Sequence, residues 1–161
     1  MRYKIRQRIF SFGDNFTIRD ENETPHFIVR GKVFSLGDKL SLEDLNGNRL
    51  FYIEQKLFKF LPEYSIFQND TQVAKVKKEF TFFKPRFSIE SRFGDYDMEG
   101  DIFSHSFQVL KNGRVVAEVS KKWFSFSDSY GVDIADGENQ AFLLALVIVI
   151  DQAIHDNDGN K

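Results

Sequence analysis

Apolar and polar residues alternate along most of this chain, beginning at its first residues. One side of the first segment carries Tyr3, Ile5, Gln7 and Ile9, and the other side carries Arg2, Lys4, Arg6 and Arg8. A period of two residues is typical of a half-buried β-strand. The pattern therefore predicts a first strand with a strongly basic outer face.

Similar short segments follow at regular spacing, separated by turn-forming residues such as Asn46-Gly47 and Asn112-Gly113. Two-residue turns of this kind join antiparallel neighbours, so strands adjacent in sequence should be adjacent in the sheet. Regular short strands predict a β-sandwich or a β-barrel. The predicted strands are Phe16–Arg19, His26–Phe34, Lys39–Leu45, Leu50–Leu57, Tyr64–Gln68, Thr71–Lys78, Arg86–Ser91, Tyr96–Ile102, Ser106–Lys111, Arg114–Lys121 and Ser129–Ile134.

The pattern changes near the C-terminus, where residues 138–155 predict a helix. Asp136 to Asn139 offer capping groups, and Ala141 to Ile150 form an unbroken apolar run. This run is shorter than the roughly 20 residues that a membrane-spanning helix needs. Because a helix that is apolar on every side must be buried on every side, the strands should wrap around it. We therefore expect a closed antiparallel barrel of about twelve strands around one buried C-terminal helix, with a polar tail at 156–161.

Length and composition predict a single-domain protein and exclude thiol chemistry. Its 161 residues, without a linker-like segment, predict a single domain over residues 1–161. The absence of Cys excludes thiol chemistry, and an N-terminus without an apolar signal-like run predicts cytoplasmic residence. A net charge of −2 argues against nucleic acid as a partner. The 19 Phe residues predict a Phe-rich interior.

Four segments that together cover most of the chain read FSFGDNFTIRDEN, FIVRGKVFSLGDKLSLEDLNGNRL, KKWFSFSDSYGVDI and QAFLLALVIVIDQ. In this order they resemble the LURP-one-related family, in particular its bacterial YxjI-like branch. The resemblance implies the fold of the tubby C-terminal domain, shared with phospholipid scramblases, and a non-catalytic role without a cofactor. Tubby domains bind phosphoinositide headgroups through Lys and Arg. No lipid ligand of that family can be matched to an individual position of this sequence.

Two basic and aromatic clusters are candidates for anion or lipid binding. In the larger one, a Phe-rich segment at Phe80–Phe83 is flanked by Lys75, Lys77, Lys78, Lys84 and Arg86. Lys and Arg can bind phosphate while exposed Phe contacts lipid. The alternative is that the lysines only solubilise an outer strand face while the Phe side chains pack inward. The second cluster is Lys121 and Lys122 beside Trp123, Phe124 and Phe126, where the favoured alternative is that Trp123 is a core or lid residue.

The acidic residues Asp95, Asp97 and Glu99 partly imitate a calcium-binding loop, but Ser106 stands where that loop ends in Glu. They describe more simply the solvated face of a strand, which could lie opposite the basic face of the first strand. His105 lies between Ser104 and Ser106, and neighbours on a strand point to opposite faces, so a Ser–His catalytic pair is not expected. No nucleotide, zinc or hydrolase motif is present.

These observations support two hypotheses about function. The first is a non-catalytic binding or scaffold module that recognises an anionic phospholipid headgroup, or a protein partner, through an outer basic face. Such a module would be cytoplasmic, at the periphery of a membrane in the lipid version. The second is a small-ligand-binding barrel, or an enzyme with a site at the barrel rim. A bulky central helix leaves little room for an internal cavity, which favours the first hypothesis. The sequence does not indicate an oligomeric state.

Overall fold

The structure is a computed structural model that describes residues 1–6, 15–31, 39–124 and 129–155. Within these residues, twelve strands and one helix follow one another. The strands are β1 (Arg2–Arg6), β2 (Phe16–Asp20), β3 (Pro25–Gly31), β4 (Lys39–Asp44), β5 (Arg49–Gln55), β6 (Glu63–Gln68), β7 (Thr71–Glu79), β8 (Arg86–Ser91), β9 (Tyr96–Asp101), β10 (Ser106–Lys111), β11 (Arg114–Ser120) and β12 (Ser129–Ile134). The helix, α1, spans Gln140–His155.

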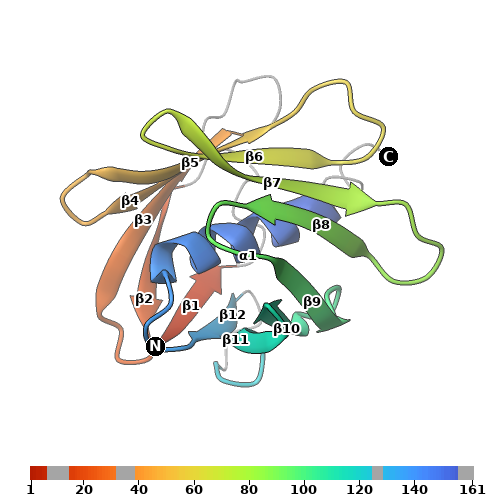
Figure 1. The fold of residues 1–161 in the computed structure, drawn as a ribbon. Coiled ribbons are helices and arrows are strands. Elements are labelled where there is room, and N and C mark those ends of the chain that lie inside the picture. Colours follow the sequence, from red (N-terminus) through yellow and green to blue (C-terminus); the bar gives the residue numbers. More distant parts are fainter. Residues whose placement is uncertain (7–14, 32–38, 125–128, 156–161) are drawn as a thin grey trace.

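All twelve strands form one antiparallel sheet in the order β8-β7-β6-β5-β4-β3-β2-β1-β12-β11-β10-β9. Strands adjacent in sequence pair with each other, as the turn residues predicted, except for β8 and β9, and β1 pairs with β12 to join the two ends of the chain. The sheet curves until its edge strands β8 and β9 lie close together (Figure 1). The result is a nearly closed barrel, which confirms the predicted fold class.

The alternation in β1 places its side chains as the sequence predicted. Tyr3 and Ile5 are buried, and they lie opposite Val132 and Tyr130 of β12. Arg6 is exposed. Residues 7–9 of the predicted first strand, and residues 32–34 of the predicted third, lie outside the described residues.

Helix α1 runs inside the curved sheet (Figure 1) and begins two residues later than predicted. The side chain of Asn139 accepts a hydrogen bond of 3.0 Å from the Phe142 amide, which is the capping interaction of a helix N-terminus. Every side chain from Phe142 to Ile150 is buried, so the prediction of a helix buried on all sides is confirmed. Within the described part of the chain, no helix is both long and apolar enough to cross a membrane.

The antiparallel order gives the barrel two different ends. At one end, the turn end, lie tight connections such as 45–48, 69–70 and 112–113. At the opposite end, the loop end, lie the β5–β6 loop (56–62), the β7–β8 loop (80–85) and the β9–β10 turn (102–105). Helix α1 begins at the turn end, where the Met1 ammonium group donates to the Ile134 carbonyl at 2.6 Å.

The Phe-rich interior is confirmed only in part. Phe51, Phe93 and Phe142 pack together beneath the sheet, with the rings of Phe93 and Phe142 4.6 Å apart. Other Phe side chains are exposed to solvent, namely Phe58, Phe60, Phe80, Phe82, Phe83 and Phe103. All six lie in the β5–β6 loop, the β7–β8 loop and the β9–β10 turn, at the loop end.

Candidate functional site

Lys75 and Lys77 of β7 lie on the outer face of the sheet, among acidic partners, whereas Lys78 is half-buried on the opposite face, which it shares with Val76. Val76 is buried, whereas Lys77 is exposed with its ammonium nitrogen 3.9 Å from a carboxylate oxygen of Glu63. Lys75 lies opposite Glu90 of β8 in the sheet register. Opposite charges on neighbouring strands stabilise pairing modestly. The solubilising interpretation of Lys75 and Lys77 therefore fits their surroundings well.

The β7–β8 loop that follows does not pack inward. Phe82 and Phe83 are 84% and 95% exposed. The Thr81 hydroxyl donates to the Lys84 carbonyl at 2.5 Å and so helps to fix the shape of the loop. Lys84 and Arg86 are exposed beside the Phe side chains, with Arg86 opposite Glu79 in the register. Of the two readings of this segment, the structure favours exposed Phe over inward packing.

The β5–β6 loop carries a second group of exposed Phe that sequence reasoning missed. Phe58 and Phe60 are 101% and 91% exposed, and Lys56 and Lys59 are exposed beside them. The backbone of Phe58 has a φ of 60°, which is unfavourable for a bulky residue. The segment reads KLFKFLP, and its alternation of Phe with Lys, ended by Pro, is the signal that could have revealed it.

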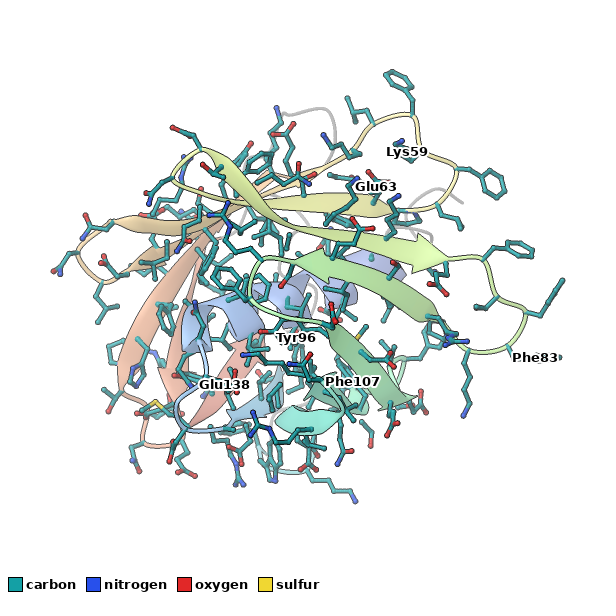
Figure 2. All side chains as sticks on the ribbon, in the orientation of Figure 1. Lys59, Glu63, Phe83, Tyr96, Phe107 and Glu138 are labelled. Carbon is teal, nitrogen blue, oxygen red and sulfur yellow. The ribbon has the colours of Figure 1, made fainter. Side chains whose placement is uncertain are left out.

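These two loops are neighbours at the loop end of the barrel. The Lys78 amide of β7 donates to the Pro62 carbonyl at 2.9 Å, which ties the start of one loop to the end of the other. The Lys56 amide donates to the Glu63 carbonyl at 2.8 Å and closes the first loop at its base. Figure 2 shows Lys59 and Phe83 on loops that project from the same side of the molecule. We call residues 56–62 and 80–85 together the Phe-loop surface.

The charge of the Phe-loop surface is entirely positive. Its residues include Lys56, Lys59 and Lys84 and no acidic residue. Acidic residues lie at its borders: Glu63 and Glu79 directly adjoin the two loops in sequence, and Asp101 at the end of β9 interacts with Lys84. The pKa of Asp101 is held below its usual value, chiefly by its hydrogen bond with Ser104 and to a smaller extent by the charge of Lys84. The β9–β10 turn, with its exposed Phe103, thus lies near the β7–β8 loop.

The second predicted cluster, Lys121 and Lys122 beside Trp123, has a different surrounding. Both lysines are exposed, but Trp123 is half-buried against the outer face of β12, where Gly131 leaves space for its ring. The Arg2 guanidinium lies 4.2 Å from the centre of the Trp123 ring and also pairs with Asp133 at 3.3 Å. Trp123 thus covers part of the basic face of β1. In the sheet, the β9–β10 hairpin separates this cluster from the Phe-loop surface.

The acidic residues Asp95, Asp97 and Glu99 are exposed around β9. Among the described residues, no three His, Asp or Glu side chains lie close enough together to hold a metal ion. The expectation that this acidic face lies opposite β1 is wrong, because β9 is an edge strand that pairs with β10 whereas β1 pairs with β2 and β12. The error arose because charge complementarity does not determine which strands are neighbours.

A buried polar group inside the barrel was also missed. His105, in the β9–β10 turn, lies 2.7 Å from Asp151 of α1 and stacks on the ring of Tyr130, with ring centres 4.5 Å apart. Burial, with a contribution from Asp151, raises the pKa of Tyr130 well above its usual value. The enclosed space beside these residues cannot hold a water molecule. This group anchors the end of α1 to the β9–β10 turn.

Comparison with known proteins places this architecture in a family. The sequence model described as LURP-one-related matches residues 1–151. The chain belongs to the LURP-one-related family. It is 39% identical over 154 residues to the uncharacterized protein YxjI of Bacillus subtilis (strain 168), an alignment that covers 96% of this chain and 94% of that protein.

The fold of this LURP-one-related chain is also similar to the X-ray structure of a protein from Arabidopsis thaliana. The TM-score is 0.66 at 20% identity, and the similarity covers 94% of this chain and 90% of the plant protein. At this identity the likeness concerns the fold. The predicted membership of the YxjI-like branch is confirmed by the match to YxjI itself.

Proposed function

We propose that this protein is a non-catalytic binding module of the cytoplasm that associates with anionic phospholipid headgroups through the loop end of its barrel. The observation that carries the proposal is the meeting of Lys56, Lys59 and Lys84 on two adjacent loops without an acidic residue. Clustered Lys and Arg attract anionic lipid surfaces by about 1 kcal/mol each. The proposal moves the binding site from the outer strand face, where Lys75 and Lys77 face Glu90 and Glu63, to the loops.

The interior of the barrel supports a binding role rather than catalysis. Helix α1 fills the space that a ligand would need in a carrier barrel. His105 and Asp151 form the kind of pair that an enzyme could use as a base, but they are buried beside a space too small for water. A substrate would therefore have to bind elsewhere.

Vesicle flotation at low and high salt tests the proposal. The protein should float with vesicles of phosphatidylglycerol and phosphatidylcholine, and stay behind with phosphatidylcholine alone or at 1 M salt (about a 3 Å screening length). The variant K59E/K84E should weaken partitioning by at least about ten-fold. The matched control R49E/R114E makes the same charge change on two exposed residues at the turn end and should bind as the unchanged protein does. Equal recovery with anionic and neutral vesicles would contradict the recognition of anionic headgroups, and no recovery with either would direct the search to a protein partner.

A further inference from the structure

The exposed Phe side chains of the loop end require an explanation that headgroup binding alone does not give. Isolated apolar side chains are common on protein surfaces, but contiguous apolar groups mark interaction sites. Here five Phe residues occupy two neighbouring loops of thirteen residues, 56–62 and 80–85. Four of them are at least 84% exposed, so they contribute almost nothing to the core of the barrel.

The arrangement of these side chains fits a fluid apolar medium. Phe58, Phe60 and Phe83 project from separate loop positions, and no ring contact joins them within the described residues. The ring contact on this surface joins Phe80 to Phe82 within one loop, with centres 5.3 Å apart. A hydrocarbon layer accepts separate projecting rings without a shaped pocket, whereas a protein partner must supply one for each anchor.

The positions of the cations indicate how deep such side chains could go. Lys59 stands between Phe58 and Phe60, and Lys84 directly follows Phe83. Long lysine side chains extend toward the headgroups while their neighbours lie deeper, at the boundary of the acyl chains. Projecting Phe side chains suit the acyl-chain region of an anionic bilayer. The adjoining Lys side chains, in loops without acidic residues, suit its headgroup region.

We infer that the Phe side chains of residues 56–62 and 80–85 insert below the phospholipid headgroups, so that the loop end of the barrel is a membrane anchor. The inference rests on the proposed function and adds to it the mode of binding and the orientation. The turn end, with the N-terminus, then faces away from the membrane. The exposed Phe103 of the neighbouring β9–β10 turn lies at the rim of the inserted surface.

Single-cysteine labelling tests the insertion, because the chain has no Cys of its own. An environment-sensitive dye is attached at Phe58→Cys, at Phe83→Cys and, as the control, at Leu45→Cys in a turn at the turn end. With vesicles of phosphatidylglycerol and phosphatidylcholine, the dyes at positions 58 and 83 should shift to the blue and be quenched by lipids that carry bromine on their acyl chains. The dye at position 45 should do neither.

Serine variants give an independent readout that does not depend on a dye. F58S/F60S and F82S/F83S should each weaken partitioning by at least about ten-fold, and L45S/V115S, which alters exposed apolar residues of the turn end, should not. Melting temperatures of all variants should stay close to that of the unchanged protein, since the altered side chains are exposed.

The outcomes separate the inference from the proposed function. One outcome is that flotation depends on salt while the dyes stay in a polar environment and the serine variants bind normally. This outcome would overturn the insertion and keep headgroup binding. Inserted dyes with equal binding to neutral vesicles would keep the insertion and overturn headgroup recognition. The absence of any flotation would overturn both. The insertion would also be overturned if the Phe loops held two copies of the protein together as a dimer and the serine variants bound vesicles as the unchanged protein does.

Discussion

Gly131 and Trp123 illustrate how a single residue controls what covers the sheet. A Cβ atom at position 131 would lie 2.6 Å from a carbon of the Trp123 ring and 2.9 Å from the Phe124 ring. Such distances force neighbouring atoms to move. The absence of a side chain at Gly131 is therefore what allows the two rings to pack closely against β12, with the Trp123 ring against the Arg2 guanidinium.

The substitution Gly131→Ala should accordingly displace the aromatic pair. Overpacking of this kind costs about 1–3 kcal/mol in the free energy of unfolding. Because Trp123 is the single Trp of the chain, its fluorescence reports the displacement directly. We expect a red-shifted emission and a lower midpoint in urea. An unchanged emission spectrum with an unchanged midpoint would show that Trp123 does not rest on Gly131.

Other residue-scale features could not be read from the sequence. A Phe residue looks the same in a core strand and in an exposed loop, and only the folded position of Phe58 distinguishes the two. His105 and Asp151 are 46 residues apart, and neither lies in a motif. Their meeting depends on how the β9–β10 turn approaches the end of α1. By contrast, the exposure of Asp97 and Glu99 followed from local alternation alone.

At the scale of elements, the chain builds the barrel around α1 rather than placing α1 on its surface. Leu144 is fully buried, and Leu146, Val147 and Val149 on other sides of the helix are buried as well. An amphipathic helix would show an exposed stripe. This burial is the reason why the helix was the most predictable element: an apolar run of helical length has few other places to go.

A charge placed in the centre of α1 should prevent folding. Leu144→Asp buries a carboxylate without a cationic partner, which costs several kcal/mol, a large share of the stability of a small domain. The matched control Leu45→Asp makes the same change at a residue that is 50% exposed and should alter stability by no more than about 0.5 kcal/mol. Circular dichroism melts measure both. A cooperative transition of Leu144→Asp at the unchanged temperature would contradict the burial of α1.

The strands were predicted with similar success, for a local reason. Alternation and turn residues located all twelve, because each signal lies within a few neighbouring residues. Which strands form the edges of the sheet could not be predicted from such local signals. That β8 and β9 are the edge strands, and that β9 does not pair with β1, follows from the joining of β1 to β12 across the whole chain.

At the scale of the whole molecule, the barrel has two ends of different character. The turn end is closed by tight turns and holds the start of α1, whereas the loop end holds all six Phe side chains that are exposed in the described part of the chain. This division explains why the sequence pointed to one half of the candidate surface and missed the other. The segment at 80–85 is recognisable in the sequence because four of its six residues are aromatic or basic. Its position beside 56–62 depends on the pairing of β6 with β7, which the sequence does not show locally.

The central claim is that the loop end of the barrel faces an anionic membrane. Hydrogen–deuterium exchange of the unchanged protein, with and without vesicles of phosphatidylglycerol and phosphatidylcholine, tests it most directly because it reports on every segment at once. The account predicts slower exchange in residues 56–62 and 80–85 with these vesicles, no slowing with phosphatidylcholine alone, and unchanged exchange in the turns at 45–48 and 112–113. Slower exchange at the turn end or along the outer face of β7, with the two loops unaffected, would contradict it.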